Sequence, residues 1–551
     1  MHTRLSTFPL EDLASNTRLK APHDALLLVC PDPAAIRLPS DLGFRTMLNH
    51  AAKVDHSFTS SVSFTVHDSA PGGRMIVSPV GSTNEFTDDV RKYADAAAAA
   101  VRRARAAGSI KPLLYVPSLS AEQGQSEEVF AKFREVALLG ALQESYVPLQ
   151  RREIWKKLGM KDHGTLEELS LVAESPADQE LVERVRCIEL GRTLARDIGG
   201  SDPERMAAPK AAEHILNAFK DTSEHTKITV MDDPKVLEKE YPLLAAVARC
   251  SLAVPRHQPR VVRIEYRSPV QEQVKENLFF VGKGITYDTG GADVKAGGVM
   301  RGMSRDKCGA AAVAGLLLTA AHLKPTHVNI TAELAFVRNS IGADSYVSDE
   351  VIISRAGVPI AVGNTDAEGR MVMSDPLAKL KDELLETRKA TSIPSRIFTV
   401  ATLTGHVIRA WGSYASAVPN GPAQKAGMAQ RIQKFGDLWG DMFEVAPLRR
   451  EDFIFGRGGS RAPELAVSSN SLPSTATNRG HQSPAAFMAV TSGIGRGRRD
   501  DEEASIEYTH LDIAGAAETT GDGSLSLGPV TGSPIVALTA AFLLPPSSSS
   551  S

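Results

Sequence analysis

Two short polar segments of the chain carry residue types that metal or acid–base chemistry needs. The first follows an apolar run and reads VGKGITYDTGG from Val281 to Gly291, with further charges at Lys295 and Asp306. Its glycines let the backbone turn sharply, so Lys283, Asp288 and the later charges could share one pocket. The glycine spacing does not fit a dinucleotide fingerprint or a phosphate-binding loop, which disfavours a nucleotide site.

The second segment is Asn364–Arg370, which reads NTDAEGR. Asp366 and Glu368 are two positions apart, and in an extended segment this spacing puts both carboxylates on one face. If they shared a pocket with Asp288 and Asp306, the four acids would repel one another and take up protons. A pair of divalent metal ions would neutralise them, as in two-metal hydrolases. The alternative is ordinary turn-forming acids and surface ion pairs, and spacing alone leaves both interpretations open.

Together, these segments resemble the signature of the leucyl aminopeptidase family, the M17 metallopeptidases. NTDAEGR is the hallmark of that family, and the VGKGITYDTGG loop with its intervals to Lys295 and Asp306 follows the preceding motif. Further matches are Ala401–Gly405 and His510–Ile513. The resemblance covers about residues 180–545, and the N-terminal part only in general layout. It is closer to a divergent, aminopeptidase-like branch than to the central enzymes.

The resemblance implies a role for each charged residue of the two segments. The implied ligands of two divalent ions, Zn²⁺ or Mn²⁺, are Lys283, Asp288, Asp306, Asp366 and Glu368. Asp288 and Glu368 would bridge the ions, and Lys283 would have to be neutral, because an ammonium group has no lone pair. Lys295 would stay charged and stabilise the oxyanion. Arg370 would hold a bicarbonate ion that acts as general base toward a metal-bridging water.

The activity that the resemblance implies is removal of N-terminal amino acids from short peptides. Positions in or near the family's first side-chain pocket are matched by Met303, Asn364, Thr402 and Gly405. Met and Thr would make this pocket apolar and of moderate size, so we expect a preference for Leu or Met at the peptide N-terminus. The resemblance also implies a homohexamer, with active sites that face an interior cavity.

Several features depart from the family pattern. Lys307 follows Asp306 where the family usually has Met, and Cys308 fills a position of small residues. We expect Lys307 to point outward and Cys308 to be a buried packing residue. The loop Gly456–His481 lacks the usual polar pattern, and the charge block at 495–504 resembles an insertion. These departures motivate an alternative, a catalytically impaired scaffold or assembly protein on the same fold, although every implied ligand is present.

The elements that must position these residues alternate between apolar runs and helical patterns, which is typical of α/β proteins. In the N-terminal part, the expected strands are Ala25–Cys30, Ser61–Val66, Met75–Val80 and Pro112–Val116, and the expected helices are Lys92–Ala107 and Glu127–Tyr146. Further along, the expected strands are Asn277–Val281, Asn329–Val337, Arg396–Leu403 and Ile506–Ile513, and the helices are Gly309–Leu323, Met371–Leu385 and Pro484–Ser492. The acidic stretch Leu166–Gln179 favours a linker or a connecting helix.

This pattern predicts two α/β domains. A smaller accessory domain covers residues 1–170, and a larger M17-like metallopeptidase domain with a mixed central sheet covers 171–545. Residues 546–551 form a serine-rich tail. Functional loops are expected at the ends of the strands of the larger sheet. The N-terminal domain shows no cluster of catalytic residue types, so we expect a packing or assembly role for it.

Composition narrows the classes of partner and compartment. The chain has 551 residues, a net charge of −3 and 42% hydrophobic residues, so it is not wholly disordered and has no global field for nucleic acid or membrane. A basic helix face within Lys92–Arg105 is the one feature that would favour nucleic acid. Four scattered cysteines fit a reduced, cytoplasmic protein. No secretory signal is recognisable, and Gly309–Leu323 is shorter than the ~20 residues of a membrane span.

Overall fold

The structure is a computed structural model. It describes residues 3–14, 22–36, 43–84, 86–118, 128–160, 165–222, 224–295, 300–455, 465–470, 472–495, 505–519 and 527–545. The chain divides into two compact units, one of residues 1–189 with 437–440 and one of residues 190–436 with 441–551. Within the described ranges, no helix has both the length and the apolar character that crossing a membrane requires.

The N-terminal unit contains a six-stranded sheet in the order β1-β6-β5-β2-β4-β3. Its strands are β1 (Arg4–Pro9), β2 (Ala25–Cys30), β3 (Ser63–Val66), β4 (Arg74–Pro79), β5 (Pro112–Tyr115) and β6 (Glu168–Ala173). All neighbouring strands are parallel except β3, which runs antiparallel to β4. The helices of this unit are α1 (Leu10–Ala14), α2 (Phe44–Val54), α3 (Arg91–Ala106), α4 (Phe133–Ser145) and α5 (Leu149–Leu158). Leu26 and Leu28 pack with Phe44 of α2 in one apolar cluster.

Strand β6 lies inside the acidic stretch 166–179, so the expectation of a linker or helix there is wrong. Leu169, Leu171 and Val172 are fully buried, and β6 pairs in parallel with both β1 and β5. The acidic residues that suggested a linker lie at the two ends of a short apolar strand. The connecting helix is α6 (Ala177–Gly200), which begins further along the chain.

The C-terminal unit contains an eight-stranded mixed sheet in the order β15-β14-β17-β13-β9-β10-β8-β7. Its strands are β7 (Thr226–Met231), β8 (Arg260–Tyr266), β9 (Glu276–Asp288), β10 (Val328–Asn339), β13 (Ser395–Ala401), β14 (Ala415–Pro419), β15 (Phe443–Val445) and β17 (Glu507–Asp512). The four central strands β17, β13, β9 and β10 are parallel, and β14 and β8 flank them in the opposite direction. The unit also contains a small three-stranded sheet, which consists of β11 (Val351–Ile353), β12 (Pro359–Ala361) and β16 (Ala466–Val467).

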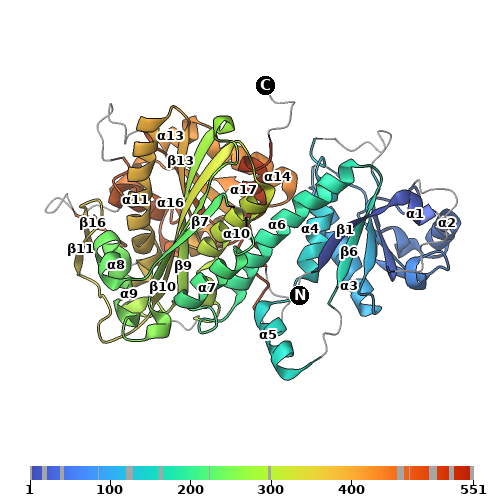
Figure 1. Ribbon diagram of the computed structural model, residues 1–551, viewed down its shortest axis with the longest axis horizontal. Coiled ribbons are helices and arrows are strands. Elements are labelled where there is room, and N and C mark those ends of the chain that lie inside the picture. The colour runs from blue at the N-terminus through green and yellow to red at the C-terminus, as the bar shows by residue number, and fades with distance from the viewer. Residues whose placement is uncertain are drawn as a thin grey trace. The chain divides into compact units, whose positions relative to one another are not determined.

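Helices cover both faces of the large sheet. Figure 1 shows α11 (Glu368–Ala390) and α16 (Gln482–Thr491) on one side, and α10 (Cys308–Leu323) and α17 (Ile535–Phe542) on the other. The alternation of side chains along β9 follows this layering. A β-carbon on Gly282 would lie 2.6 Å from Ala310 of α10, whereas the next residue, Lys283, packs against Gly369 of α11. The two-sided burial explains the near-continuous apolar run of β9.

The remaining helices of the C-terminal unit connect these layers. They are α7 (Ala208–Ala218), α8 (Pro234–Glu240), α9 (Pro242–Ala248), α12 (Gly405–Trp411), α13 (Gly421–Lys425), α14 (Met428–Trp439) and α15 (Arg450–Phe455). The predicted α/β class with a mixed central sheet is confirmed, and the expected strands and helices are present. Two ends differ widely from the expectation, because α4 begins six residues later at Phe133 and β9 runs seven residues further to Asp288. The serine-rich tail at 546–551 and residues 496–504 of the charge block lie outside the described residues.

Candidate metal centre

The polar segments singled out in the sequence meet at one edge of the large sheet. Asp288 ends β9, Asn339 ends the neighbouring strand β10, and the two residues lie side by side in register. Thr402 follows the end of β13, and Glu368 begins α11. Parallel strands bring their carboxyl ends to the same edge, which is where sites of α/β proteins form.

Three carboxylates form the centre of this site. Carboxylate oxygens of Asp288, Asp366 and Glu368 all lie within 4.8 Å of one another. Lys295 bridges two of these acids, because its Nζ lies 2.8 Å from Asp288 Oδ2 and also donates to Asp366 Oδ1. The turn at Gly290, whose φ is +86°, allows this approach. A β-carbon there would lie 2.8 Å from the backbone nitrogen of Lys295, so glycine is required.

A buried cation and a fourth carboxylate extend the cluster. Lys283 Nζ lies 2.9 Å from Asp306 Oδ2 and 2.9 Å from Glu368 Oε1, and it donates to the carbonyl oxygen of Thr402 at 3.1 Å. Gly369 makes room for it, since a β-carbon there would lie 2.6 Å from Lys283 Cε. The glycine of NTDAEGR therefore has a steric role in the site.

Burial and crowding of like charges shift the titration of these acids. Burial together with the charge of Asp288 raises the pKa of Glu368 to about 8, and burial raises the pKa of Asp306 to about 6 against the opposing charge of Lys283. The pKa of Asp366 is raised in the same way. Burial opposes the charge of Lys283, but Asp306 and Glu368 outweigh it and hold that pKa above its ordinary value. The positive charge of the neighbouring lysines is therefore too small to offset the burial and mutual repulsion of these acids.

The residues present fit divalent metal ions. Glu368 Oε2 is buried and has no hydrogen-bond partner among the described residues, so a ligating oxygen is available. Clustered carboxylate oxygens are the donors that hard divalent ions prefer. The five implied metal ligands, which are Lys283, Asp288, Asp306, Asp366 and Glu368, all belong to this cluster.

The sequence-based interpretation missed residues that hold the acids in place. The buried side chain of Asn339 donates to Asp288 Oδ1 at 2.8 Å and to the Thr365 carbonyl oxygen at 3.1 Å. Thr365 Oγ1 in turn donates to the Gly290 carbonyl oxygen at 2.6 Å, and Tyr346 donates to the Thr365 carbonyl oxygen. The signal available in the sequence was a polar residue at the carboxyl end of a predicted strand.

The implied anion-binding residue, Arg370, is partly free to bind another group. Its Nη1 donates to the carbonyl oxygen of Ser468 at 2.8 Å. Its Nε is buried and has no partner within the described part of the chain. Burial lowers the pKa of Arg370 to about 10, so the guanidinium is still charged at neutral pH.

The residues expected in the substrate pocket make different contacts around the carboxylate cluster. Thr402 Oγ1 donates to Asp306 Oδ1 at 2.8 Å, so its hydroxyl is directed to a carboxylate. Asn364 Oδ1 accepts from the backbone nitrogen of Asp366 at 2.7 Å and shapes that turn. Met303, three positions before Asp306, is half-buried. Gly405 begins α12, and a β-carbon there would lie 2.9 Å from the side chain of Thr475.

The two residues that depart from the family pattern point away from the acids. Lys307 is fully buried, so the expectation that it points outward is wrong. Its Nζ donates to the Ser201 carbonyl oxygen at 2.9 Å and to that of Ser304, and these acceptors make its burial tolerable. Cys308 is a buried packing residue, as expected. A β-carbon on Gly199 would lie 2.7 Å from its sulfur.

Three histidines near the site had no predicted role. His406 and His481 approach with their Nδ1 atoms 2.7 Å apart. His510 is fully buried, its Nδ1 lies 2.8 Å from Thr399 Oγ1, and its Nε2 has no partner among the described residues. Burial and the charge of His406 lower the pKa of His481 to about 4. Burial, with the charge of His481, lowers the pKa of His510 to about 3.

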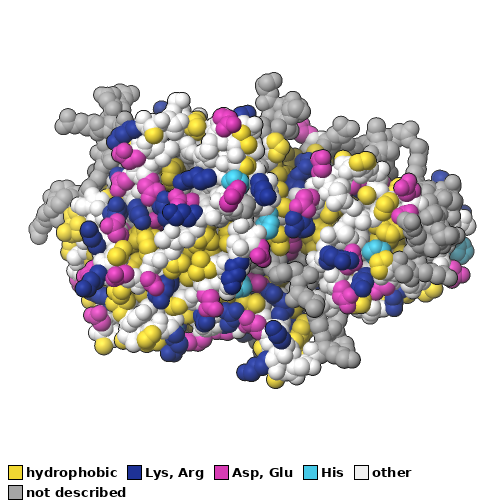
Figure 2. Space-filling view, in the orientation of Figure 1, with side chains coloured by type: hydrophobic (Ala, Val, Ile, Leu, Met, Phe, Trp, Pro, Cys, Tyr) yellow, Lys and Arg dark blue, Asp and Glu magenta, His cyan; other side chains and the backbone are white. Residues whose placement is uncertain are grey.

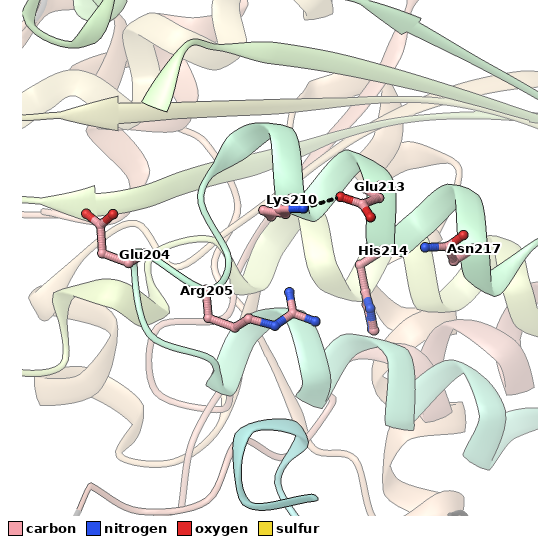
Figure 3. Close-up of a pocket in the computed structure, with 6 residues that line it drawn as sticks. All are labelled: Glu204, Arg205, Lys210, Glu213, His214 and Asn217. Atoms are coloured by element: carbon pink, nitrogen blue, oxygen red, sulfur yellow. Dashed lines mark hydrogen bonds and ion pairs between the residues drawn. The ribbon is translucent and has the colours of Figure 1, made fainter. Parts of the chain in front are cut away.

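A pocket that contains none of the clustered carboxylates lies beside α7. It has a volume of about 400 Å³ and is lined by Glu204, Arg205, Lys210, Glu213, His214 and Asn217. Figure 3 shows the ion pair of Lys210 with Glu213 and the side chains of Arg205 and His214 directed into the same space. The pocket contains none of the predicted site residues.

The basic helix face that would have favoured nucleic acid makes contacts within its own unit. Arg102 and Arg105 both form ion pairs with Glu144, and the guanidinium of Arg103 lies 4.5 Å from the ring centroid of Phe64. Over the visible face of the molecule, basic and acidic side chains are interspersed (Figure 2).

Carboxylates and a lysine gather at the carboxyl ends of the strands of a mixed α/β sheet, an arrangement that is compatible with a hydrolase that uses hard divalent ions. Residues 193–539 match the model described as the cytosol aminopeptidase family, catalytic domain. The chain belongs to this family, and its class is accordingly aminopeptidase and hydrolase.

Known proteins resemble the chain over most of its length. A Caenorhabditis elegans protein named "Putative aminopeptidase" is 39% identical over 500 residues, which is 90% of each chain. A "Probable cytosol aminopeptidase" of Campylobacter jejuni is 30% identical over 61% of this chain and 62% of its own. Among solved structures, "Bottromycin maturation enzyme BotP in complex with Mn" has a TM-score of 0.72 at 20% identity, and covers 94% of this chain and 98% of its own. That last similarity concerns the fold alone.

Proposed function

We propose that the protein is a two-metal aminopeptidase that hydrolyses N-terminal residues from short peptides. The observation that carries this proposal is the carboxylate cluster, in which oxygens of Asp288, Asp366 and Glu368 lie within 4.8 Å of one another. Asp306 and Lys283 adjoin it directly. Membership of the cytosol aminopeptidase family supports the same activity.

In this proposal, two divalent ions, Zn²⁺ or Mn²⁺, are held by the five clustered residues. Asp288 and Glu368 are central in the cluster and would serve both ions. When bound, such ions polarise a carbonyl oxygen and lower the pKa of water, which makes a nucleophile available near neutral pH. Lys283 would have to give up its proton to become a ligand. Binding of cations would also relieve the repulsion that raises the pKa of Glu368.

Two cations of the chain would act on the reacting groups. Lys295 is partly exposed and lies against Asp288 and Asp366, so its ammonium would donate a hydrogen bond to the oxyanion that develops beside them. Arg370 would use its unpartnered Nε to hold a small anion such as bicarbonate, which accepts the proton of the attacking water. Both tasks need a cation that stays charged at neutral pH.

Substrate preference, assembly and location complete the proposal. Met303, Asn364, Thr402 and Gly405 would border the first side-chain pocket, and we propose a preference for Leu or Met there. A homohexamer and a cytoplasmic location are proposed from the family resemblance, and the names of the relatives support the location. One of the departures that motivate the scaffold alternative is weakened, because the Nζ of Lys307 donates to the carbonyl oxygens of Ser201 and Ser304.

An assay with matched variants tests the activity. Purified protein would be loaded with Mn²⁺ or Zn²⁺ and offered Leu- and Met-amide substrates, together with the variants Glu368→Ala and Lys295→Ala. Removal of an oxyanion donor costs about 10²–10³ in kcat, and we expect a loss of that size for Lys295→Ala. Glu213→Ala removes an exposed carboxylate of α7 that is ion-paired with Lys210 and serves as the control.

The outcome that contradicts the proposal is turnover no higher than that of Glu368→Ala. Elemental analysis after reconstitution gives a second readout, because the proposal requires two divalent ions per chain and a lower content in Glu368→Ala. If the protein folds but binds no metal, the scaffold alternative remains as the explanation of this fold.

A further inference from the structure

Two histidines share one hydrogen bond next to the candidate metal centre. His406 is the second residue of α12, and His481 directly precedes α16. Their Nδ1 atoms are 2.7 Å apart, and the ring centroids are 4.9 Å apart. One Nδ1 must carry a proton and the other must accept it. If both nitrogens are protonated, the acceptor is lost and the two positive charges repel.

The loop that precedes His406 contacts two of the proposed metal ligands. The loop before α12 is Thr402–Thr404, where Thr402 accepts from Lys283 Nζ at 3.1 Å and donates to Asp306 Oδ1 at 2.8 Å. Thr404 Oγ1 donates to Asp512 Oδ2 at 2.6 Å and caps α12. The position of α12 therefore sets the position of Thr402 against two of the proposed ligands.

The His481 side is fixed to the protein independently. Arg479, two residues before His481, forms an ion pair with both carboxylate oxygens of Asp452 of α15, with distances of 2.6 and 2.8 Å. A β-carbon on Gly480 would lie 2.9 Å from His406 Cβ, so the chain here packs closely on α12. His481 is 2% exposed. The segment that carries it can act as a fixed support for α12.

The charged and titratable groups around the pair come from each element packed against it. They are Arg409 of α12, Arg479 of the supporting segment, Asp452 of α15 and His510 of β17. Burial, with the charge of Arg409, lowers the pKa of His406. Burial and the charge of His406 lower that of His481 to about 4, with Asp452 opposing. Both rings are therefore neutral near pH 7, which is the state that the hydrogen bond needs.

We propose that His406 and His481 are a positioning pair whose single hydrogen bond holds the Thr402–Thr404 loop against Lys283 and Asp306. Entry of a second proton separates the rings, loosens the loop and weakens the metal centre. The pair touches no reacting atom, and its role in catalysis depends on the aminopeptidase function proposed above. Its effect on metal affinity does not depend on that function.

The variants that test this role separate hydrogen bonding from protonation. Asparagine at position 406 can still hydrogen-bond to His481 Nδ1 but cannot take up a proton, whereas alanine removes the contact. His406→Asn, His406→Ala and the wild type would be compared at pH 7.5 and pH 4.0, the latter close to the pKa of His481. The control is His214→Asn, a partly exposed histidine of α7 whose Nε2 lies 3.6 Å from Asp197. Mn²⁺ affinity by calorimetry and kcat/KM with Leu-amide are measured side by side.

We expect His406→Ala to lose at least tenfold in Mn²⁺ affinity and kcat/KM at pH 7.5, and His406→Asn to recover most of that loss. The ratio of the pH 4.0 value to the pH 7.5 value should be about twofold higher in His406→Asn than in wild type, and unchanged in His214→Asn. An unchanged ratio in His406→Asn, or wild-type affinity in His406→Ala, overturns the positioning pair. Absence of turnover with the expected Mn²⁺ changes overturns the aminopeptidase activity and leaves the pair standing.

Discussion

The hydroxyl of Thr402 offers a quantitative test of how the metal centre is built. It donates to Asp306 Oδ1 at 2.8 Å, and both groups are largely withdrawn from solvent. Thr402→Val removes this donor and keeps the shape of the side chain, whereas Thr402→Ser keeps the hydroxyl. The change therefore isolates one hydrogen bond to one proposed ligand.

The expected magnitude follows from the charge of the acceptor. A hydrogen bond to a charged group contributes about 1.5–3 kcal/mol, which corresponds to about 10–150-fold in an equilibrium constant. Burial already raises the pKa of Asp306 to about 6, and loss of a donor to the carboxylate form raises it further. Since the carboxylate is the form that binds a cation, the defect of Thr402→Val should grow as the pH falls from 7.5 to 6.5.

Calorimetric titration with Mn²⁺ at both pH values measures this effect without any substrate. We expect Thr402→Val to bind at least tenfold more weakly than wild type at pH 7.5, and Thr402→Ser to stay within threefold. If Thr402→Val binds within threefold of wild type at both pH values, Asp306 does not depend on this hydroxyl and the argument fails.

Further predictions concern packing and buried titratable groups. Gly315→Ala should destabilise the protein by about 1–3 kcal/mol, because its β-carbon would lie 2.4 Å from a carbonyl oxygen of α6. The control in chemical denaturation is Gly200→Ala, whose β-carbon would make an ordinary contact with Val530 at 3.7 Å. Burial lowers the pKa of His510 to about 3, so the native state loses stability as pH falls below about 6.5. His510→Asn should therefore lose about 3 kcal/mol less than wild type between pH 7 and pH 4, and equal losses would refute this. Burial raises the pKa of Cys308 to about 12, so mass spectrometry should find it alkylated at pH 8 only after denaturation.

The parts of the fold that the sequence predicted well are those with strong local patterns. The buried run of β2 was placed at its observed ends, Ala25–Cys30, and α10 within one residue, because continuous apolar runs show burial directly. Strand β6 was missed, since its short apolar run is flanked by acids. Antiparallel strands such as β8 (Arg260–Tyr266) mix buried and half-buried positions and give a weaker signal.

For the site, most of the residues proposed as metal ligands could be selected from the sequence because they stand in two compact motifs. Groups that depend on distant partners were not. The acceptor that directs Lys307 inward is Ser201, 106 positions away in the chain, and His406 meets His481 across 75 positions. Asn339 is one polar residue at a strand end, and its role follows from the pairing of β10 with β9. Such contacts are products of the tertiary fold.

Strand β9 carries Lys283 and Asp288 on one continuous extended segment of 13 residues. A slip of one residue in its pairing would turn Lys283 to the opposite face, toward α10. The cluster proposed to bind metal ions can therefore form only when the central strands are aligned correctly. Metal uptake would then report successful assembly of the larger unit, and a nascent or damaged chain with misaligned strands would remain without metal and without hydrolytic capacity.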